Sequence, residues 1–91
     1  MTQRFEFNEE KNLILKKSRG VNFEDILQAI KDDKMLDDIG NGRDKYKHQR
    51  ILVVKIKNYI YAVPYVKNSK GILFLKTLYP SRVLTKRYLN K

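Results

Sequence analysis

Three strand-like runs follow one another in the second half of the chain, and they constrain the fold more than any other feature. Residues 49–56 read "QRILVVKI", residues 59–66 read "YIYAVPYV" and residues 72–79 read "ILFLKTLY". The two residues "KN" separate the first run from the second, and the five residues "KNSKG" separate the second from the third. Runs rich in β-branched and aromatic residues that are joined by such short polar turns predict an antiparallel β-meander.

The first half of the chain predicts a short strand followed by two helices. The segment "TQRFEF" alternates polar and apolar residues, as a strand does. A helix is expected from Asn8, because acids begin this segment, lysines end it and Gly20 follows its last turn. Asn22 predicts the N-cap of a second helix, with Asp25 three residues later. Residues 40–49 predict a loop, and residues 81–91 a short terminal helix.

The predicted order is therefore β-α-α-β-β-β-α, which indicates an α+β domain with an antiparallel sheet and its helices on one face. A chain of 91 residues with 42% hydrophobic residues can bury one small core, so residues 1–91 are expected to form a single domain. The chain has no cysteine, no run near the roughly 20 apolar residues that span a bilayer and no segment resembling a signal peptide. We therefore expect a cytoplasmic protein with no membrane association.

Charge divides the chain into two unlike halves. Residues 1–42 hold seven Lys/Arg and nine Asp/Glu, whereas residues 43–91 hold thirteen Lys/Arg and a single acid, Asp44. A formal net charge of +10 on a small domain favours a polyanionic partner, because binding relieves the self-repulsion and releases counterions. Nucleic acid is the first partner to consider. A basic surface that only maintains solubility and an acidic protein partner are the alternatives.

Few kinds of catalytic chemistry are open to this composition. With one histidine and no cysteine, His/Cys zinc clusters and Cys-His nucleophiles are excluded. The segment "GNGRDK" lacks the ending of a phosphate-binding loop, and the spacing of the acids at 32, 33, 37 and 38 fits no calcium loop. We therefore expect neither a metal nor a cofactor.

RNA cleavage remains open, because the nucleophile can be the 2′-hydroxyl of the RNA itself. The protein then needs a base, a proton donor and positive charge near the phosphate. His48 could move protons, although a lone histidine in a basic loop is more often an ordinary surface residue. Lys76 alternates with apolar residues on one predicted strand face, where an anion would offset its desolvation. Arg82 follows Pro80 and could offer a planar fork to a phosphate.

Both ends of the chain resemble a known family. The segment "FEFNEEKNLILKKSRGVNFEDILQAI" is similar to the opening of the BrnT family of bacterial type II toxins, whose pattern is roughly F-x-W-D-x-x-K, a helix ending in K-H-G-V, and then S-F-E-E-A. The closing "FLKTLYPSRVLTKRY" resembles the strand, turn and basic helix that end such toxins. The matching positions are Phe5, Lys11, Gly20, Val21, Phe23 and Glu24, while Phe7-Asn8 stands for Trp-Asp and Arg19 for the histidine before the glycine.

The resemblance implies a RelE-like fold, ribosome-independent RNA cleavage that stalls translation, and neutralisation by a DNA-binding antitoxin of ribbon-helix-helix or similar type. The alternative is a noncatalytic nucleic-acid-binding or antitoxin-binding domain. The predicted catalytic group comprises Lys17, Arg19, His48, Lys76 and Arg82. The predicted RNA-binding residues are Lys45, Lys47, Arg50, Tyr79, Lys86 and Arg87.

Overall fold

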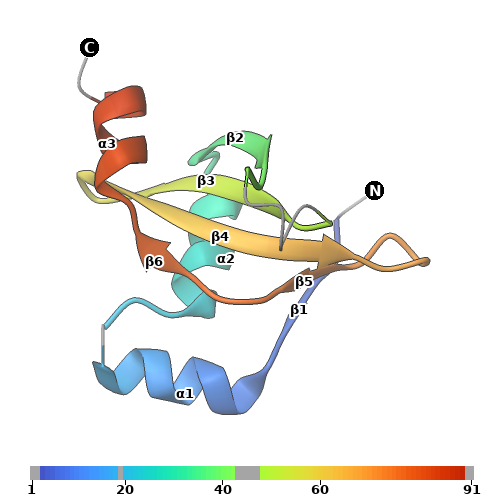
Figure 1. The fold of residues 1–91 in the computed structure, drawn as a ribbon. Helices are drawn as coiled ribbons and strands as arrows, with labels where there is room; N and C mark the ends of the chain where they lie inside the picture. Colours follow the sequence, from blue (N-terminus) through green and yellow to red (C-terminus); the bar gives the residue numbers. More distant parts are fainter. Residues whose placement is uncertain (1–2, 19, 43–47, 90–91) are drawn as a thin grey trace.

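The computed structural model describes residues 3–18, 20–42 and 48–89, which form three helices and a mixed sheet (Figure 1). This arrangement confirms the predicted α+β class. In chain order the elements are β1 (Phe5–Phe7), α1 (Glu9–Ser18), α2 (Phe23–Lys31), β2 (Met35–Gly40), β3 (Arg50–Ile56), β4 (Tyr59–Lys67), β5 (Leu73–Leu75), β6 (Tyr79–Pro80) and α3 (Arg82–Leu89). No helix of these described ranges has both the length and the apolar character needed to cross a membrane.

The sheet has the strand order β1-β5-β4-β3-β2, and β6 pairs with β4 off this path. The predicted meander is present, since β3, β4 and β5 are antiparallel neighbours. A two-residue turn joins β3 to β4, where Ile56 pairs with Tyr59. The sheet is nevertheless mixed rather than antiparallel throughout, because β1 pairs in parallel with β5, as in the register Phe5 to Leu73. The two partners lie far apart in sequence, so local patterns carry no sign of this pairing.

Strand β2 was not predicted. It forms an edge of the sheet by pairing antiparallel with β3, and five of its six residues are exposed. The predicted loop begins within this strand at Gly40, and residues 43–47 of that prediction lie outside the described residues.

The third predicted strand is interrupted opposite Pro64 of β4. The Lys76 N–H donates to the Pro64 carbonyl at 2.8 Å, but proline has no N–H to return. In an antiparallel sheet, the N–H and C=O of one residue point to the same neighbouring strand, so Pro64 can offer only its carbonyl to the β5–β6 segment. On that edge of β4, strand pairing therefore stops after β5 and resumes at β6. The expected irregularity thus lies in the neighbouring segment, while Pro64 itself is buried rather than solvated.

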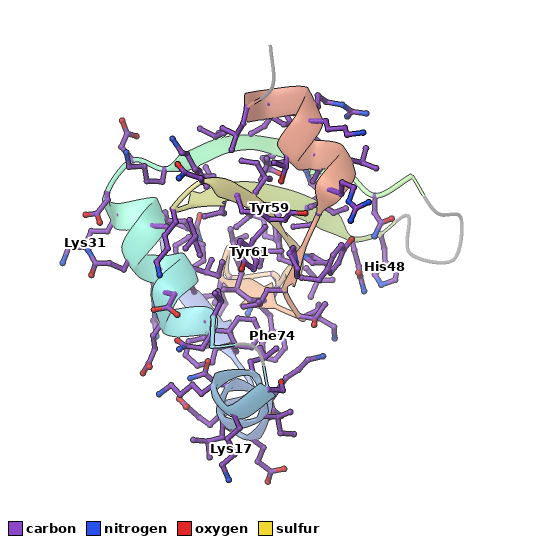
Figure 2. All side chains as sticks on the ribbon, turned by 90° about the vertical axis from the view of Figure 1, so that its left-hand side faces the viewer. Lys17, Lys31, His48, Tyr59, Tyr61 and Phe74 are labelled. Atoms are coloured by element: carbon purple, nitrogen blue, oxygen red, sulfur yellow. The ribbon has the colours of Figure 1, made fainter. Side chains whose placement is uncertain are left out.

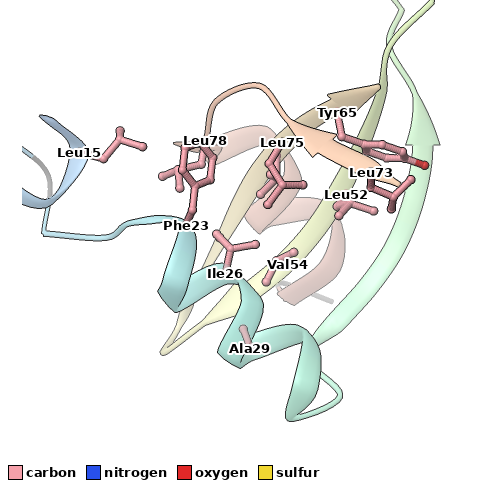
Figure 3. Close-up of a cluster of buried hydrophobic side chains, with 11 residues drawn as sticks. Leu15, Phe23, Ile26, Ala29, Leu52, Val54, Tyr65, Leu73, Leu75 and Leu78 are labelled. Carbon is pink, nitrogen blue, oxygen red and sulfur yellow. The ribbon is translucent and has the colours of Figure 1, made fainter. Parts of the chain in front are cut away.

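The larger core lies between the sheet and the first two helices. Phe23, Ile26 and Ala29 of α2 face strand residues such as Leu52 and Val54 (Figure 3). The rings of Phe7 and Phe23 stack with their centroids 4.9 Å apart, which connects β1 to the start of α2. This core accounts for the positions of α1 and α2 on one face of the sheet.

Helix α3 lies on the opposite face, which corrects the prediction that all helices share one face. Its buried residue Leu84 packs with Val53, Ile60 and Ala62, which alternate with residues of the larger core along β3 and β4. Figure 2 shows α2 and α3 on opposite sides of the sheet. The Thr85 hydroxyl also accepts a hydrogen bond from the Ile60 N–H at 3.0 Å. The sheet therefore has a second, smaller core that local sequence patterns did not indicate.

Candidate nucleic-acid interface

A cleft of about 330 Å³ opens where pairing between β4 and its neighbour is interrupted. Pro64 lies at two-residue spacing from Ile60 and Ala62, so the cleft and α3 share a face of the sheet. The side chains come from α1, from the two ends of the β2–β3 connection, from β4 and from the segment between β5 and β6. The lining residues are Lys11, Asn41, Gln49, Pro64, Lys76, Thr77 and Tyr79.

Positive charge in this cleft comes from two lysines. Lys11 is half-buried and Lys76 is exposed. Among the described residues, no carboxylate lines the cleft and neither lysine has a carboxylate partner within 4.0 Å. The ammonium groups are therefore available to an external anion.

Lys76 is placed differently from the sequence-based expectation. The chain leaves β5 at Leu75, so the Lys76 side chain is exposed rather than desolvated on a strand face. Its Nζ atom lies 5.4 Å from the centroid of the Phe74 ring, a cation-π contact that orients the ammonium group without neutralising it. Lys76 therefore lines the cleft as an exposed side chain, and the prediction that it takes part in a functional site stays a prediction.

A flat ring and neutral polar groups accompany the lysines. Tyr79 is 39% exposed on β6, where it pairs with Ala62. The Gln49 carbonyl accepts a hydrogen bond from the Asn41 N–H at 3.3 Å, which holds the two sides of the β2–β3 connection together at the cleft. The side chains of Gln49 and Thr77 add donors and acceptors to the lining. This combination suits a ligand with a phosphate, hydroxyl groups and a planar base.

The four described residues of the predicted catalytic group do not form one cluster. Lys76 lines the cleft, and Arg82 is exposed at the start of α3, just after β6. His48 is exposed and directly precedes Gln49 of the lining. Figure 2 shows His48 on the α3 side of the sheet and Lys17 away from it at the end of α1. Arg19 lies outside the described residues.

The predicted RNA-binding residues fall into three groups. Lys86 and Arg87 are exposed on α3, which carries no acid, and Lys86 shares one side of the helix with Arg82 of the predicted catalytic group through their four-residue spacing. Together with Tyr79 they extend the positive surface beyond the cleft. Lys45 and Lys47 lie outside the described residues.

Arg50 forms contacts within the fold. Its Nε lies 3.0 Å from Asp38 Oδ1, and its Nη2 donates to the Asp38 carbonyl at 2.8 Å. The hydrogen bond to Asp38 raises the pKa of Arg50. The Tyr65 hydroxyl donates to the other Asp38 oxygen at 2.7 Å, and burial followed by this bond raises the pKa of Tyr65 to about 12. Arg50 is thus neutralised within the fold, on the strand face that Leu52 and Val54 occupy.

Lys11 is the cation of the described cleft lining that sequence reasoning did not select. It appeared only as a matching position in the family resemblance. It lies on α1, far from Lys76 in sequence, and only the folded chain brings both to one cleft. No local signal could have identified the pair.

A larger cleft of about 560 Å³ lies between α2 and the β3–β4 turn. Its lining mixes the carboxylates of Asp25 and Asp32 with Lys34, Lys55 and Lys57, so it lacks a uniform field for an anion. Within the described part of the chain, no group of three His, Cys, Asp or Glu side chains is arranged to hold a metal ion.

Comparison of the chain with family models, curated proteins and solved structures finds no significant match. The resemblance to the BrnT toxins is therefore carried by the quoted motifs alone.

Proposed function

We propose that the chain is the toxin of a type II toxin-antitoxin system, a cytoplasmic, metal-independent ribonuclease of RelE-like type that binds RNA at the Lys11–Lys76 cleft. The observation that carries this proposal is a cleft lined by two lysines, Lys11 and Lys76, whose described lining contains no carboxylate. The exposed Tyr79 ring and the cations of α3 flank the cleft and extend it into a path for a nucleic-acid backbone.

In the proposed reaction, the 2′-oxygen of RNA attacks the adjacent phosphorus and the bond from phosphorus to the 5′-oxygen breaks. The products are a 2′,3′-cyclic phosphate and a 5′-hydroxyl. This step therefore consumes no water, and the proposed mechanism uses no metal ion. Lys11 and Lys76 stabilise the charge that develops on the phosphorane oxygens. His48 and Tyr79 are the candidates to take the 2′-proton and to return one to the leaving oxygen. Arg82 binds a neighbouring phosphate.

The partner proposed from the family resemblance is a DNA-binding antitoxin of ribbon-helix-helix or similar type. We propose that it covers the cleft and α3, because acidic or apolar segments placed there would mask the cations that recruit RNA. The resemblance motifs and the exposed positive surface support this proposal.

The test is incubation of purified, partner-free protein with total RNA at low salt in the presence of a chelator. We expect fragments ending in 2′,3′-cyclic phosphate from the wild type, and a loss of at least about tenfold in cleavage rate with Lys11→Ala or Lys76→Ala. Lys31→Ala is the matched control, because it removes the same charge from an exposed position on the opposite side of the sheet (Figure 2). Intact RNA with the wild-type protein would refute the nuclease proposal.

A noncatalytic nucleic-acid-binding domain is the second candidate. It is favoured by the absence of any imidazole or carboxylate from the described lining of the cleft, which leaves the Tyr79 hydroxyl, or His48 beside the cleft, to act as the general base. Binding measurements at several salt concentrations separate the two. Under this alternative the RNA stays intact. Lys76→Ala then weakens binding of all sequences alike, and the slope of the logarithm of the binding constant against the logarithm of the salt concentration becomes less steep by about one.

A further inference from the structure

The outward side of α1 combines apolar and charged residues in an unusual order. Leu13 and Ile14 are 56% and 63% exposed, although Leu15 beside them is buried. Glu10 and Lys17 lie on the same side of the helix, one turn before and one turn after this apolar pair. We call Glu10, Leu13, Ile14 and Lys17 the outer stripe.

The other sides of α1 already have partners. Asn12 and Leu15 are buried against the domain, Lys11 lines the cleft, and Lys16 forms an ion pair with Glu24 at 2.8 Å. Among the described residues, neither Glu10 nor Lys17 has an ion-pair partner. Figure 1 shows α1 at the foot of the molecule, with its far side turned away from the sheet. The outer stripe is therefore accessible.

The outer stripe is complementary to itself in the antiparallel direction. Glu10 lies as far before the midpoint between Leu13 and Ile14 as Lys17 lies after it. A two-fold axis at this midpoint places Leu13 against Ile14 of a second copy, and Glu10 against its Lys17. One pairing thus covers the exposed apolar side chains and forms two symmetric ion pairs, as an isologous interface requires.

Charge also favours this location for contact between copies. Each chain carries +10, so association through the basic second half would bring like charges together. The first 42 residues hold seven cations and nine acids, which makes α1 part of the nearly neutral half. We propose that the protein forms a reversible homodimer through antiparallel contact of two α1 helices along the outer stripe.

The contact is small. A helix of ten residues is about 15 Å long, and two of them bury less than the roughly 1,200 Å² of a standard stable interface. We therefore expect an equilibrium between monomer and dimer that depends on concentration. The cleft remains open in this dimer, since it lies on another side of α1 from the outer stripe.

A charge-swap experiment tests this dimer by sedimentation equilibrium at low salt, from micromolar to millimolar concentration. Glu10→Lys and Lys17→Glu should each lower the association constant at least about tenfold, because each sets like charges against each other at two symmetric places. The double variant restores opposite charges and should recover the wild-type constant. Lys17→Glu is the sharper single change: it lowers the formal net charge from +10 to +8, so general repulsion alone would predict stronger association.

Glu9→Lys is the matched control, since it makes the same charge change in the same turn but on another side of the helix. Glu9→Lys should dimerise about as strongly as the wild type, whereas Glu10→Lys should dimerise more weakly. Circular dichroism should show that every variant is folded. A wild-type protein that stays monomeric over the whole range overturns the proposal. A double variant no better associated than the single variants overturns it as well, because contact with any other surface would give no such rescue.

Discussion

Asn12 connects α1 to the first turn of α2, and its removal should destabilise the whole domain. The side chain is 2% exposed, and its Oδ1 accepts a hydrogen bond from the Phe23 N–H at 2.8 Å. Phe23 is fully buried and is the first residue of α2, so its N–H has no partner within that helix. In Asn12→Ala this donor stays buried without an acceptor.

The size of the effect follows from two opposing contributions. Leaving a buried donor unsatisfied costs about 1–3 kcal/mol. Alanine has a higher helix propensity than asparagine, which returns about 0.5 kcal/mol. We expect a net loss of about 0.5–2.5 kcal/mol in the free energy of unfolding, or about 2–20 °C in melting temperature for a domain of this size.

Urea denaturation followed by circular dichroism measures this loss, and hydrogen exchange of the Phe23 amide shows where it arises. Lys31→Ala serves as the control, because Lys31 is exposed on α2 and should change stability by less than about 0.5 kcal/mol. The reasoning is wrong if Asn12→Ala falls within that same range, or if Phe23 exchange is unchanged while stability falls.

Two further predictions concern a turn and a pH-dependent contact. Lys57 has φ 58°, where an L side chain is strained, so Lys57→Gly should raise the free energy of unfolding by about 0.5–1 kcal/mol in urea titrations, whereas Asn58→Gly, at ordinary φ, should not. The Tyr88 hydroxyl donates to Asp37 at 2.6 Å and holds the pKa of Asp37 below its usual 3.8, so the stabilisation is present above about pH 4 and is lost as the pH falls through the lowered pKa. Tyr88→Phe should therefore be less stable than the wild type near neutral pH, and the urea midpoints of the two proteins should converge as the pH falls below the lowered pKa of Asp37. Midpoints that stay equally separated at every pH would contradict this assignment.

Local signals predicted those elements whose ends are specified by neighbouring residues. The Asn22 side chain accepts from the backbone of Glu24 and Asp25, and Asp25 accepts from the Asn22 N–H, which is the capping box that the sequence indicated. The short turn after Ile56 likewise joins two strands as expected. In both cases the determining contacts span three residues or fewer.

Contacts between distant segments determined what the sequence left open. Strand β2 is an exposed edge strand, and its acidic residues make its sequence look like that of a solvated loop. It becomes a strand because β3 supplies its hydrogen-bond partners. Helix α3 shows an apolar side in its sequence but no sign of which sheet face will receive it. The candidate site follows the same rule: Lys76 was selected from its own neighbourhood, whereas Lys11 acquires its role only from the packing of α1.

Several acids of the first half make contacts within the fold, and few of these contacts reach the cations of the second half. Five of them are engaged in this way: Glu24 with Lys16, Asp25 with the Asn22 backbone, Asp32 with Gln28, Asp37 with Tyr88, and Asp38 with Arg50 and Tyr65. Within described residues 48–89, Arg50 is consequently the only cation with a carboxylate within 4.0 Å.

The remaining cations at the cleft and on α3 therefore face solvent without an internal counterion. Lys76, Arg82, Lys86 and Arg87 are all exposed, and their charges are compensated only when another molecule supplies anionic groups along this face. An RNA backbone does so at regular spacing, and an acidic protein segment does so at fewer points. Both would need the same side chains, so a protein partner bound here would block RNA by direct competition, without a conformational change in the domain.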